Sequence, residues 1–255
     1  MKYIDCQVIK NSIIHQDYGR ISLDVPDIAS SAMPGQFVML KYWQGYTPFL
    51  MRPFSINAAN RINGTIDILY KVIGEGTALL QRLKSGEKIK ILGPLGNNFP
   101  IRNDFTRIAI IGRGVGAAPL RFLADCALEK KIDVQVFISA SQPQFFFDED
   151  FYKSVDCNFI GSCDDNKIIT TFFEDQLKID TFDAAYTCGS KRLINDIKRL
   201  MDIYSFEGYA SLEEHMACGI GACKGCVCSI YREGTEQYAR VCKEGPIFPI
   251  RNLVK

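Results

Sequence analysis

Four cysteines near the carboxyl end constrain this chain more than any other feature of its sequence. Cys218, Cys223 and Cys226 follow one another at C-x4-C-x2-C spacing, and Cys242 comes after fifteen further intervening residues. Three thiolates at this spacing converge from one tight loop, and the glycines between them allow the positive φ values that such a loop needs. The spacing is that of a plant-type 2Fe-2S cluster, whose fourth ligand comes from a separate strand or turn. We therefore predict that these four cysteines ligate such a cluster.

A structural zinc ion is the alternative for four thiolates. Zinc motifs usually pair two C-x2-C knuckles, whereas this segment holds only one, so the spacing favours the cluster. Cys228 follows Cys226 by two residues and is interpreted as a bystander. The chain has no export signal, which argues against a disulfide framework. The cysteines outside the cluster motif are expected to be mostly small buried apolar residues; these are Cys6, Cys126, Cys157, Cys163, Cys188 and Cys228.

Charge and hydropathy exclude several classes of partner. The 255 residues include 30 Lys and Arg against 29 Asp and Glu, which leaves no basic face for nucleic acid or anionic lipid. No apolar run approaches the roughly 20 residues that cross a bilayer, and the amino terminus has no signal-peptide pattern. We expect a soluble, cytoplasmic protein that binds small molecules or other proteins, with no nucleic-acid or membrane partner.

Hydrophobic periodicity divides the chain into three regions. Apolar residues alternate with polar ones over 21–25 and 66–72, which predicts an antiparallel β-barrel over residues 1–102. From about residue 105, short apolar runs alternate with helical stretches such as 192–204, as in a parallel α/β domain over 103–206. The Gly- and Cys-rich remainder, 207–255, is expected to need the cluster as a staple. The predicted fold class is thus α+β and multidomain.

Two segments of the predicted barrel suit a flavin. Arg52-Pro53-Phe54-Ser55 ends a strand, and Gly76 and Thr77 open a helix 24 residues later. A guanidinium and a hydroxyl can bind a pyrophosphate, and a glycine turn at a helix start adds backbone N–H groups and a favourable dipole. Alone, the first segment fits a surface arginine after a strand better than a flavin site. Its spacing from the helix start favours a flavin site.

A glycine-rich turn opens the predicted α/β domain. Gly112, Gly114 and Gly116 lie between a buried strand and a helix, where the backbone can approach a pyrophosphate closely. The pattern is not the G-x-G-x-x-G fingerprint, and a glycine turn without a ligand is the alternative; the flanking strand and helix favour a nucleotide. The next strand ends in FISASQPQ, with no Lys or Arg to bind a 2′-phosphate, so we predict NAD rather than NADP.

The order of these motifs, together with GPLGNNF at 93–99 and Cys188-Gly189-Ser190, resembles the ferredoxin-NADP reductase-like flavoproteins. Within them, SLEEHMACGIGACKGC and VCKEGPIF resemble the family of electron-transfer subunits of class 1B dihydroorotate dehydrogenases, over nearly the whole chain. The resemblance implies that Cys188 lies beside the nicotinamide as a candidate catalytic residue, and a buried structural thiol is the alternative. It also implies an FAD site formed by Arg52, Pro53, Phe54, Ser55, Leu69, Tyr70, Lys71, Gly76 and Thr77.

The resemblance further implies a partner. In that family a separate FMN-containing catalytic subunit oxidises dihydroorotate in pyrimidine biosynthesis, and electrons pass through the cluster and FAD to NAD in a hetero-oligomer. Nothing in this chain resembles that FMN subunit. Two departures are visible: Arg113 interrupts the usual run of glycines, and Ser190 stands where the family has proline. Two alternatives stay open, namely a paralogous NAD(P)H-flavin reductase subunit for another oxidoreductase, and a cluster- and nucleotide-binding sensor without turnover.

Overall fold

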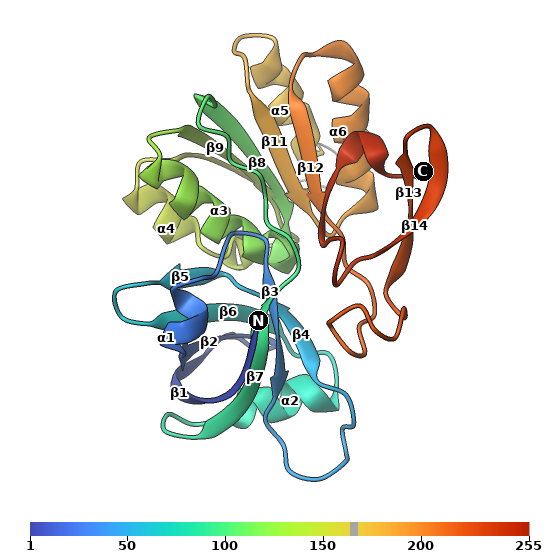
Figure 1. The fold of residues 1–255 in the computed structure, drawn as a ribbon. Helices are drawn as coiled ribbons and strands as arrows, with labels where there is room; N and C mark the ends of the chain where they lie inside the picture. The colour runs from blue at the N-terminus through green and yellow to red at the C-terminus, as the bar shows by residue number, and fades with distance from the viewer. Residues whose placement is uncertain (164–167, 255) are drawn as a thin grey trace.

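The amino-terminal strands follow the period-two pattern of the sequence and curl into one antiparallel sheet (Figure 1). The computed structural model describes residues 1–163 and 168–254. The sheet order is β4-β3-β7-β1-β2-β6-β5, and alternate residues such as Ile21, Leu23 and Ile68 fill its interior. The elements are β1 (Lys2–His15), β2 (Tyr18–Asp24), α1 (Pro26–Ala29), β3 (Phe37–Lys41), β4 (Arg52–Ser55), β5 (Ala58–Asn60), β6 (Thr65–Lys71), α2 (Glu75–Arg82) and β7 (Lys88–Leu95).

A second sheet lies above the barrel in Figure 1. Its order is β10-β9-β8-β11-β12-β15, and its neighbours are parallel except for the last pair. The strand order reverses between β8 and β11, and such switch points are where open α/β sheets bind ligands. The elements are β8 (Arg107–Arg113), the 3-10 helix η1 (Gly114–Ala117), α3 (Ala118–Glu129), β9 (Asp133–Ser139), η2 (Pro143–Phe145), α4 (Glu149–Ser154), β10 (Asn158–Ser162), α5 (Ile169–Leu177), β11 (Ala184–Cys188), α6 (Lys191–Ile203), β12 (Glu207–Ser211) and β15 (Ile247–Pro249).

Helices cover both faces of this second sheet, because successive residues of a strand point to opposite sides. Ile108 and Ile110 of β8 pack with α3, whereas Ala109 and Ile111 pack with α5 and α6. The helical spacing predicted for 192–204 is present in α6, whose buried side chains are Leu193, Ile194, Ile197, Leu200 and Met201. The predicted fold class, an antiparallel barrel followed by a parallel α/β region and a small carboxyl-terminal region, is confirmed.

The carboxyl-terminal region is anchored to the rest of the molecule by apolar packing as well as by its cysteines. It adds the hairpin β13 (Val227–Arg232) and β14 (Thr235–Arg240) and ends in η3 (Ile250–Asn252). Val241, Phe248 and Ile250 are buried in the same core as α5 and α6. The strands β12 and β15 both belong to the α/β sheet, so the proposed boundary at 206/207 passes through that sheet and does not separate two cores.

The cysteines outside the cluster motif are less buried than the sequence predicts. Of the six cysteines outside the motif, only Cys6 and Cys188 are buried, while Cys163 is exposed and the others are half-buried. The expectation of mostly buried thiols was therefore too broad, because a small apolar side chain also fits the rim of a core.

Among the described residues, no helix is both long enough and apolar enough to cross a membrane.

Candidate functional site

The four motif cysteines come together at the end of the carboxyl-terminal region that faces the barrel. Cys218 and Cys223 lie in the loop between β12 and β13, Cys226 directly precedes β13, and Cys242 follows β14. The loop lies against the barrel at Gly219, where a Cβ atom would come within 2.7 Å of Met39 Cγ. Since Gly219 also has a φ of +70°, only glycine fits there without strain.

Backbone N–H groups surround the four sulfur atoms. The amide of Gly221 donates to Cys242 Sγ at 3.1 Å. The amides of Cys223, Gly225 and Cys242 donate to the sulfurs of Cys218, Cys223 and Cys226, each at 3.4 Å. Hydrogen bonds to cluster sulfurs are one of the means by which proteins stabilise and tune iron-sulfur centres. The residues present therefore fit a cluster with thiolate ligands.

The sulfurs form two pairs. Cys218 shares a side-chain hydrogen bond with Cys223, and Cys242 shares one with Cys226. Burial tends to raise the pKa of the Cys218 thiol, but hydrogen bonds from backbone N–H groups outweigh burial and lower that pKa to about 6. Burial and the neighbouring Cys226 raise the pKa of the Cys242 thiol to about 12. Within residues 1–163 and 168–254, no three side chains of potential metal ligands are placed to share one ion. Two pairs of thiolates match a 2Fe-2S cluster in which each iron takes two cysteine ligands.

Cys228 lies apart from these pairs. It stands in β13 opposite Ala239, half-buried against the core shared with α5 and α6. Residues two apart in a strand point the same way, so strand alternation does not separate Cys228 from Cys226. Cys226 instead precedes the strand, and its carbonyl accepts the Val241 amide at 2.9 Å. In the described chain no amide of another residue donates to the Cys228 sulfur, and its role as a bystander stays a prediction.

The structure brings Arg52, Gly76 and Thr77 together, as a flavin phosphate site requires. A Cβ atom on Gly76 would lie 2.8 Å from Arg52 Nε, so the guanidinium contacts the start of α2. The Tyr42 hydroxyl donates to the Gly76 carbonyl at 2.7 Å. The Thr77 hydroxyl oxygen accepts from the amides of Ile73 and Gly74 at 2.9 and 3.2 Å, which fixes the turn before the helix.

The other residues proposed for FAD lie on β4 and β6. Pro53 and Ser55 pair with Met39 and Phe37 of β3, the strand that the cysteine loop contacts. The rings of Phe54 and Tyr70 meet edge to face at 6.5 Å. Tyr70 itself points into the barrel, where its hydroxyl donates to Asn11 at 2.9 Å.

The neighbours of Tyr70 on β6 point the other way, toward the α/β region. Leu69 packs against Ala118 of α3 and Phe147. Lys71 is exposed and lies over the Tyr18 ring at 5.4 Å. The segment 69–71 thus lies between the barrel and the nucleotide turn, where a flavin between the two regions would contact it.

The three glycines of the nucleotide turn lie in three different local environments. A Cβ on Gly112 would lie 2.7 Å from Ala117 Cβ, and one on Gly116 would lie 3.4 Å from the Cys188 carbonyl. Gly114 has a φ of +51°, and a Cβ there would meet no atom within 4 Å. Gly112 and Gly116 are therefore needed for packing between strand and helix, while Gly114 borders the open space that a pyrophosphate would occupy.

Cys188 lies at the end of β11 beside this turn. Its sulfur is 4.0 Å from Glu213 Oε1, and burial together with that carboxylate raises the pKa of the thiol well above its usual range. A buried neutral thiol does not act as a nucleophile. A packing role beside a nicotinamide suits this position better than covalent chemistry.

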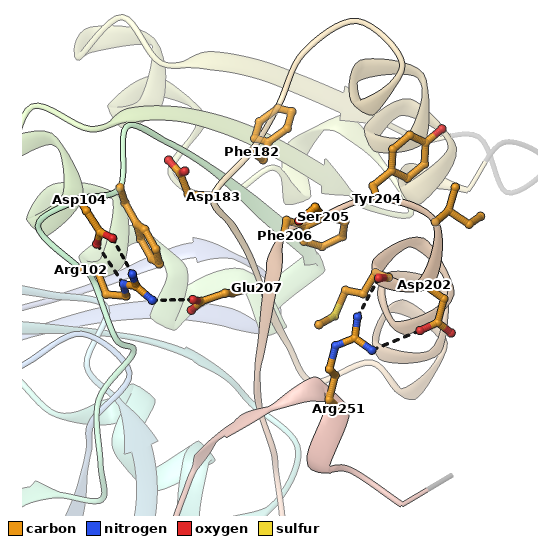
Figure 2. A pocket seen from close by; sticks show the side chains of 13 residues that line it. Arg102, Asp104, Phe182, Asp183, Asp202, Tyr204, Ser205, Phe206, Glu207 and Arg251 are labelled. Carbon is orange, nitrogen blue, oxygen red and sulfur yellow. Dashed lines mark hydrogen bonds and ion pairs between the residues drawn. The ribbon is translucent and has the colours of Figure 1, made fainter.

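Two cavities lie at opposite ends of the α/β sheet. Figure 2 shows the larger, of about 610 Å³, at the amino-terminal ends of β11 and β12. Its arginines are neutralised within it, because Arg102 pairs with Asp104 and Glu207, and Arg251 pairs with Asp202. The smaller has a volume of about 50 Å³ and lies at the carboxyl-terminal strand ends. Because α/β sheets bind nucleotides at those strand ends, the larger cavity is the less suited of the two to the predicted chemistry.

Sequence reasoning did not single out two polar groups that hold the regions together. The Asn97 side chain donates to the carbonyls of Glu244 and Ile247 at 3.0 and 2.8 Å and accepts the Ile247 amide at 2.9 Å. Asp148, whose side chain is only 3% exposed, pairs with Arg20 of the barrel. The motif GPLGNNF contains Asn97, but the pairing of residues 20 and 148 has no local signal in the sequence.

Known proteins resemble the chain over its whole length. Residues 5–99 match the model of the oxidoreductase FAD-binding domain, and residues 213–254 match that of the iron-sulfur cluster binding domain of dihydroorotate dehydrogenase B. A "dihydroorotate dehydrogenase B (NAD(+)), electron transfer subunit" of Desulforamulus reducens is 30% identical over 258 residues, covering 99% of this chain and 98% of that protein. The protein of the same name from Fusobacterium nucleatum is 31% identical, covering 97% of both chains.

Solved structures support the fold. A chain of an NADH-dependent reduced ferredoxin-NADP oxidoreductase aligns with a TM-score of 0.84 at 22% identity, covering 98% of this chain and 89% of that chain. A ferredoxin NADP+ reductase from Neisseria gonorrhoeae with bound FAD and NADP aligns with a TM-score of 0.62 at 16% identity, covering 82% and 99%. At these identities the likeness shows a shared architecture.

Proposed function

From the fact that the chain belongs to the family of dihydroorotate dehydrogenase B electron-transfer subunits, we propose that it passes electrons between a partner oxidoreductase, its own 2Fe-2S cluster, FAD and NAD. The partner is an FMN-containing catalytic subunit that oxidises dihydroorotate. The two chains form a cytoplasmic hetero-oligomer that serves pyrimidine biosynthesis. The sites are the residues already described, with Cys218, Cys223, Cys226 and Cys242 as the cluster ligands.

One observation carries this proposal, namely the position of the cysteine loop against the barrel. Gly219 touches Met39 of β3, and Met39 pairs in register with Pro53 of β4. Neighbouring strands are about 4.8 Å apart, so the strand that the cysteine loop contacts lies directly beside the segment proposed to hold FAD. When bound, FAD takes a hydride from nicotinamide and exchanges single electrons with a cluster, which converts one kind of transfer into the other.

Side chains and backbone amides of this chain would bind and orient the cofactors. Arg52 and the turn fixed by Thr77 supply a guanidinium and backbone amides to the FAD pyrophosphate. Gly114 leaves room for the dinucleotide pyrophosphate at the start of η1. Leu69 packs against Ala118, so the barrel contacts the start of α3 directly after the nucleotide turn. The amides of the cysteine loop compensate the charge of four thiolates.

The experiment is an anaerobic titration of the purified protein with NADH, followed by visible absorption and electron paramagnetic resonance. We expect bound FAD and a 2Fe-2S spectrum, with FAD bleached first and the cluster reduced afterwards. Protein that carries FMN, that carries zinc, or that reacts with neither NADH nor NADPH would contradict the proposal.

The companion chain provides a second test. Copurification from the native host should yield an FMN protein, and dihydroorotate should then reduce the cluster. A companion with different chemistry would instead make this chain the reductase subunit of another oxidoreductase.

A further inference from the structure

We propose that Trp43 is a positioning residue for FAD, because its indole ring holds the Arg52 guanidinium in place for the FAD pyrophosphate. The inference rests on the proposed function, in which Arg52 is the arginine that binds that phosphate group. The guanidinium carbon of Arg52 lies over the Trp43 ring, 5.6 Å from the ring centroid. This distance is within the roughly 6 Å at which the π face of an aromatic ring attracts a cation.

Contacts from three sides keep the guanidinium beside the start of α2. Arg52 Nη1 donates to the Leu50 carbonyl, and a Cβ atom on Gly76 would lie 2.8 Å from Arg52 Nε. The Trp43 ring is the third contact. In the described part of the chain no carboxylate forms an ion pair with Arg52. The positive charge is therefore held in place without being neutralised, which suits a group that binds a phosphate.

Tyr42 fixes the place of Trp43. The rings of Tyr42 and Trp43 meet edge to face, with their centroids 4.9 Å apart. The Tyr42 hydroxyl donates to the Gly76 carbonyl at 2.7 Å, so the segment after β3 is tied to the start of α2 (Figure 1). Burial raises the pKa of the Tyr42 hydroxyl well above its usual range, and the hydroxyl therefore keeps the proton that it donates.

Trp43 acts through its ring and not through its N–H group. The Nε1 atom is buried, and it has no hydrogen-bond acceptor among the described residues. A buried donor without a partner lowers the stability of the fold, so packing alone does not favour tryptophan at this position. Indole does offer a cation the most favourable π face of the aromatic side chains. The position of Arg52 over this ring thus gives the tryptophan a role that packing does not.

The test is a double-mutant cycle between Trp43 and Arg52. The FAD dissociation constant is measured by diluting the holoprotein and following the rise in flavin fluorescence. We expect Trp43→Leu, which keeps an apolar side chain but removes the π face, to raise this constant about 3- to 10-fold. Trp43→Phe should raise it less, because a ring remains. In the Arg52→Ala background, Trp43→Leu should change the constant by less than about twofold, because the group on which Trp43 acts is gone.

The matched control is Tyr46→Leu, since Tyr46 is an exposed aromatic residue of the same loop. It should retain FAD like wild type. If Trp43→Leu does not fold, Trp43→Met takes its place in the cycle, because methionine also lacks a π face and its flexible side chain adapts to irregular spaces.

A second measurement needs no substitution. Trp43 is the one tryptophan of the 255 residues, so the tryptophan emission of the protein comes from this position alone. Flavin absorbs light in the range in which tryptophan emits, and release of FAD on dilution should therefore raise the emission of Trp43. Unchanged emission would place FAD away from Trp43 and overturn the inference.

The cycle can overturn the inference in three ways. Wild-type affinity in Trp43→Leu would do so, and so would equal losses in Trp43→Phe and Trp43→Leu. An equal loss with and without Arg52 would mean that Trp43 contacts the flavin directly or only supports the barrel. Wild-type protein that retains no FAD would instead overturn the proposed function.

Discussion

Single residues decide which cysteines hold the cluster. Cys223 pairs with Cys218 and accepts the Gly225 amide, whereas Cys228 has no such surroundings in the described chain. We expect Cys223→Ser to lose the visible absorption of the 2Fe-2S cluster, because a hydroxyl replaces a thiolate ligand. Cys228→Ser is the control and should keep the full spectrum. Loss of the cluster in Cys228→Ser but not in Cys242→Ser would refute the ligand assignment.

Arg52 supplies the guanidinium of the proposed flavin site. Arg52→Ala should weaken FAD retention by about 10- to 100-fold, since one charge-assisted contact to a phosphate contributes about 1.5–3 kcal/mol. The measurement is FAD release on dilution, followed by the rise in flavin fluorescence. Arg61→Ala, at an exposed position of the same barrel, should retain FAD like wild type. Equal FAD release from the two variants would remove Arg52 from the site.

The nucleotide turn is tested at Gly114, whose φ is +51°. Gly114→Val should abolish reduction of FAD by NADH, because valine is strained at a positive φ and its side chain enters the space left for the dinucleotide. Flavin and cluster spectra should stay unchanged. Gly234→Val is the control, with a φ of +77° and open space at a distant hairpin turn. Normal NADH reactivity in Gly114→Val would show that the dinucleotide binds elsewhere.

At the scale of elements, Asn97 joins the loop after β7 to the segment that leads into β15. The Asn97 side chain makes three hydrogen bonds to residues 244–247. Asn97→Ala removes them, a loss of about 2 kcal/mol in the stability of that segment. Hydrogen exchange of amides in 244–249 should then accelerate about 30-fold. Asn98→Ala is the matched control, because Asn98 bonds to its neighbour Phe99. Equal exchange in both variants would mean that apolar packing alone holds the segment.

Local sequence patterns predicted the strands and helices better than they predicted which strands pair with one another. The alternation in β2 and β6 and the helical spacing in α6 follow from which face is buried, and that information lies within each segment. The place of β15 beside β12 depends on pairs such as Tyr209 with Pro249 and Ser211 with Ile247. These partners are far apart in the chain, and no short window of sequence contains both.

The candidate site likewise has a part that the sequence predicted and a part that only the fold brings together. The cysteine spacing and the glycine turn were visible because each is a continuous motif. The smaller cavity at the carboxyl-terminal strand ends was not, because its residues come from separate strand ends and helix starts. Distant residues meet only after the sheet has formed its register.

At the scale of the whole molecule, a buried polar group fixes the barrel against the α/β region. Asp148 pairs with Arg20 of β2, and it accepts from Asn57 Nδ2 at 3.0 Å. Asp148 has a φ of +65°. Asp148→Asn keeps the shape, and asparagine tolerates a positive φ, but the change leaves the arginine without its partner charge. We expect the free energy of unfolding to fall by about 2 kcal/mol in urea titrations.

The same variant should slow the transfer from NADH to FAD, since that step requires the two regions to keep their relative orientation. Asp150→Asn, at an exposed position in α4, is the control and should change neither quantity. An unchanged transfer rate in a destabilised Asp148→Asn protein would show that the regions stay aligned without this pair.

The strand β15 also determines the order in which the molecule is completed during synthesis. β12 ends at residue 211 and its partner β15 begins only at residue 247, so β12 is an unpaired sheet edge until the ribosome has added that later segment. Open edges pair readily with other polypeptides. Cys242 lies only five residues before Ile247, so metal delivery and closure of the edge involve the same short stretch of backbone. Detachment of β15 would thus leave β12 as an open edge of the sheet, and self-association of the protein would begin there.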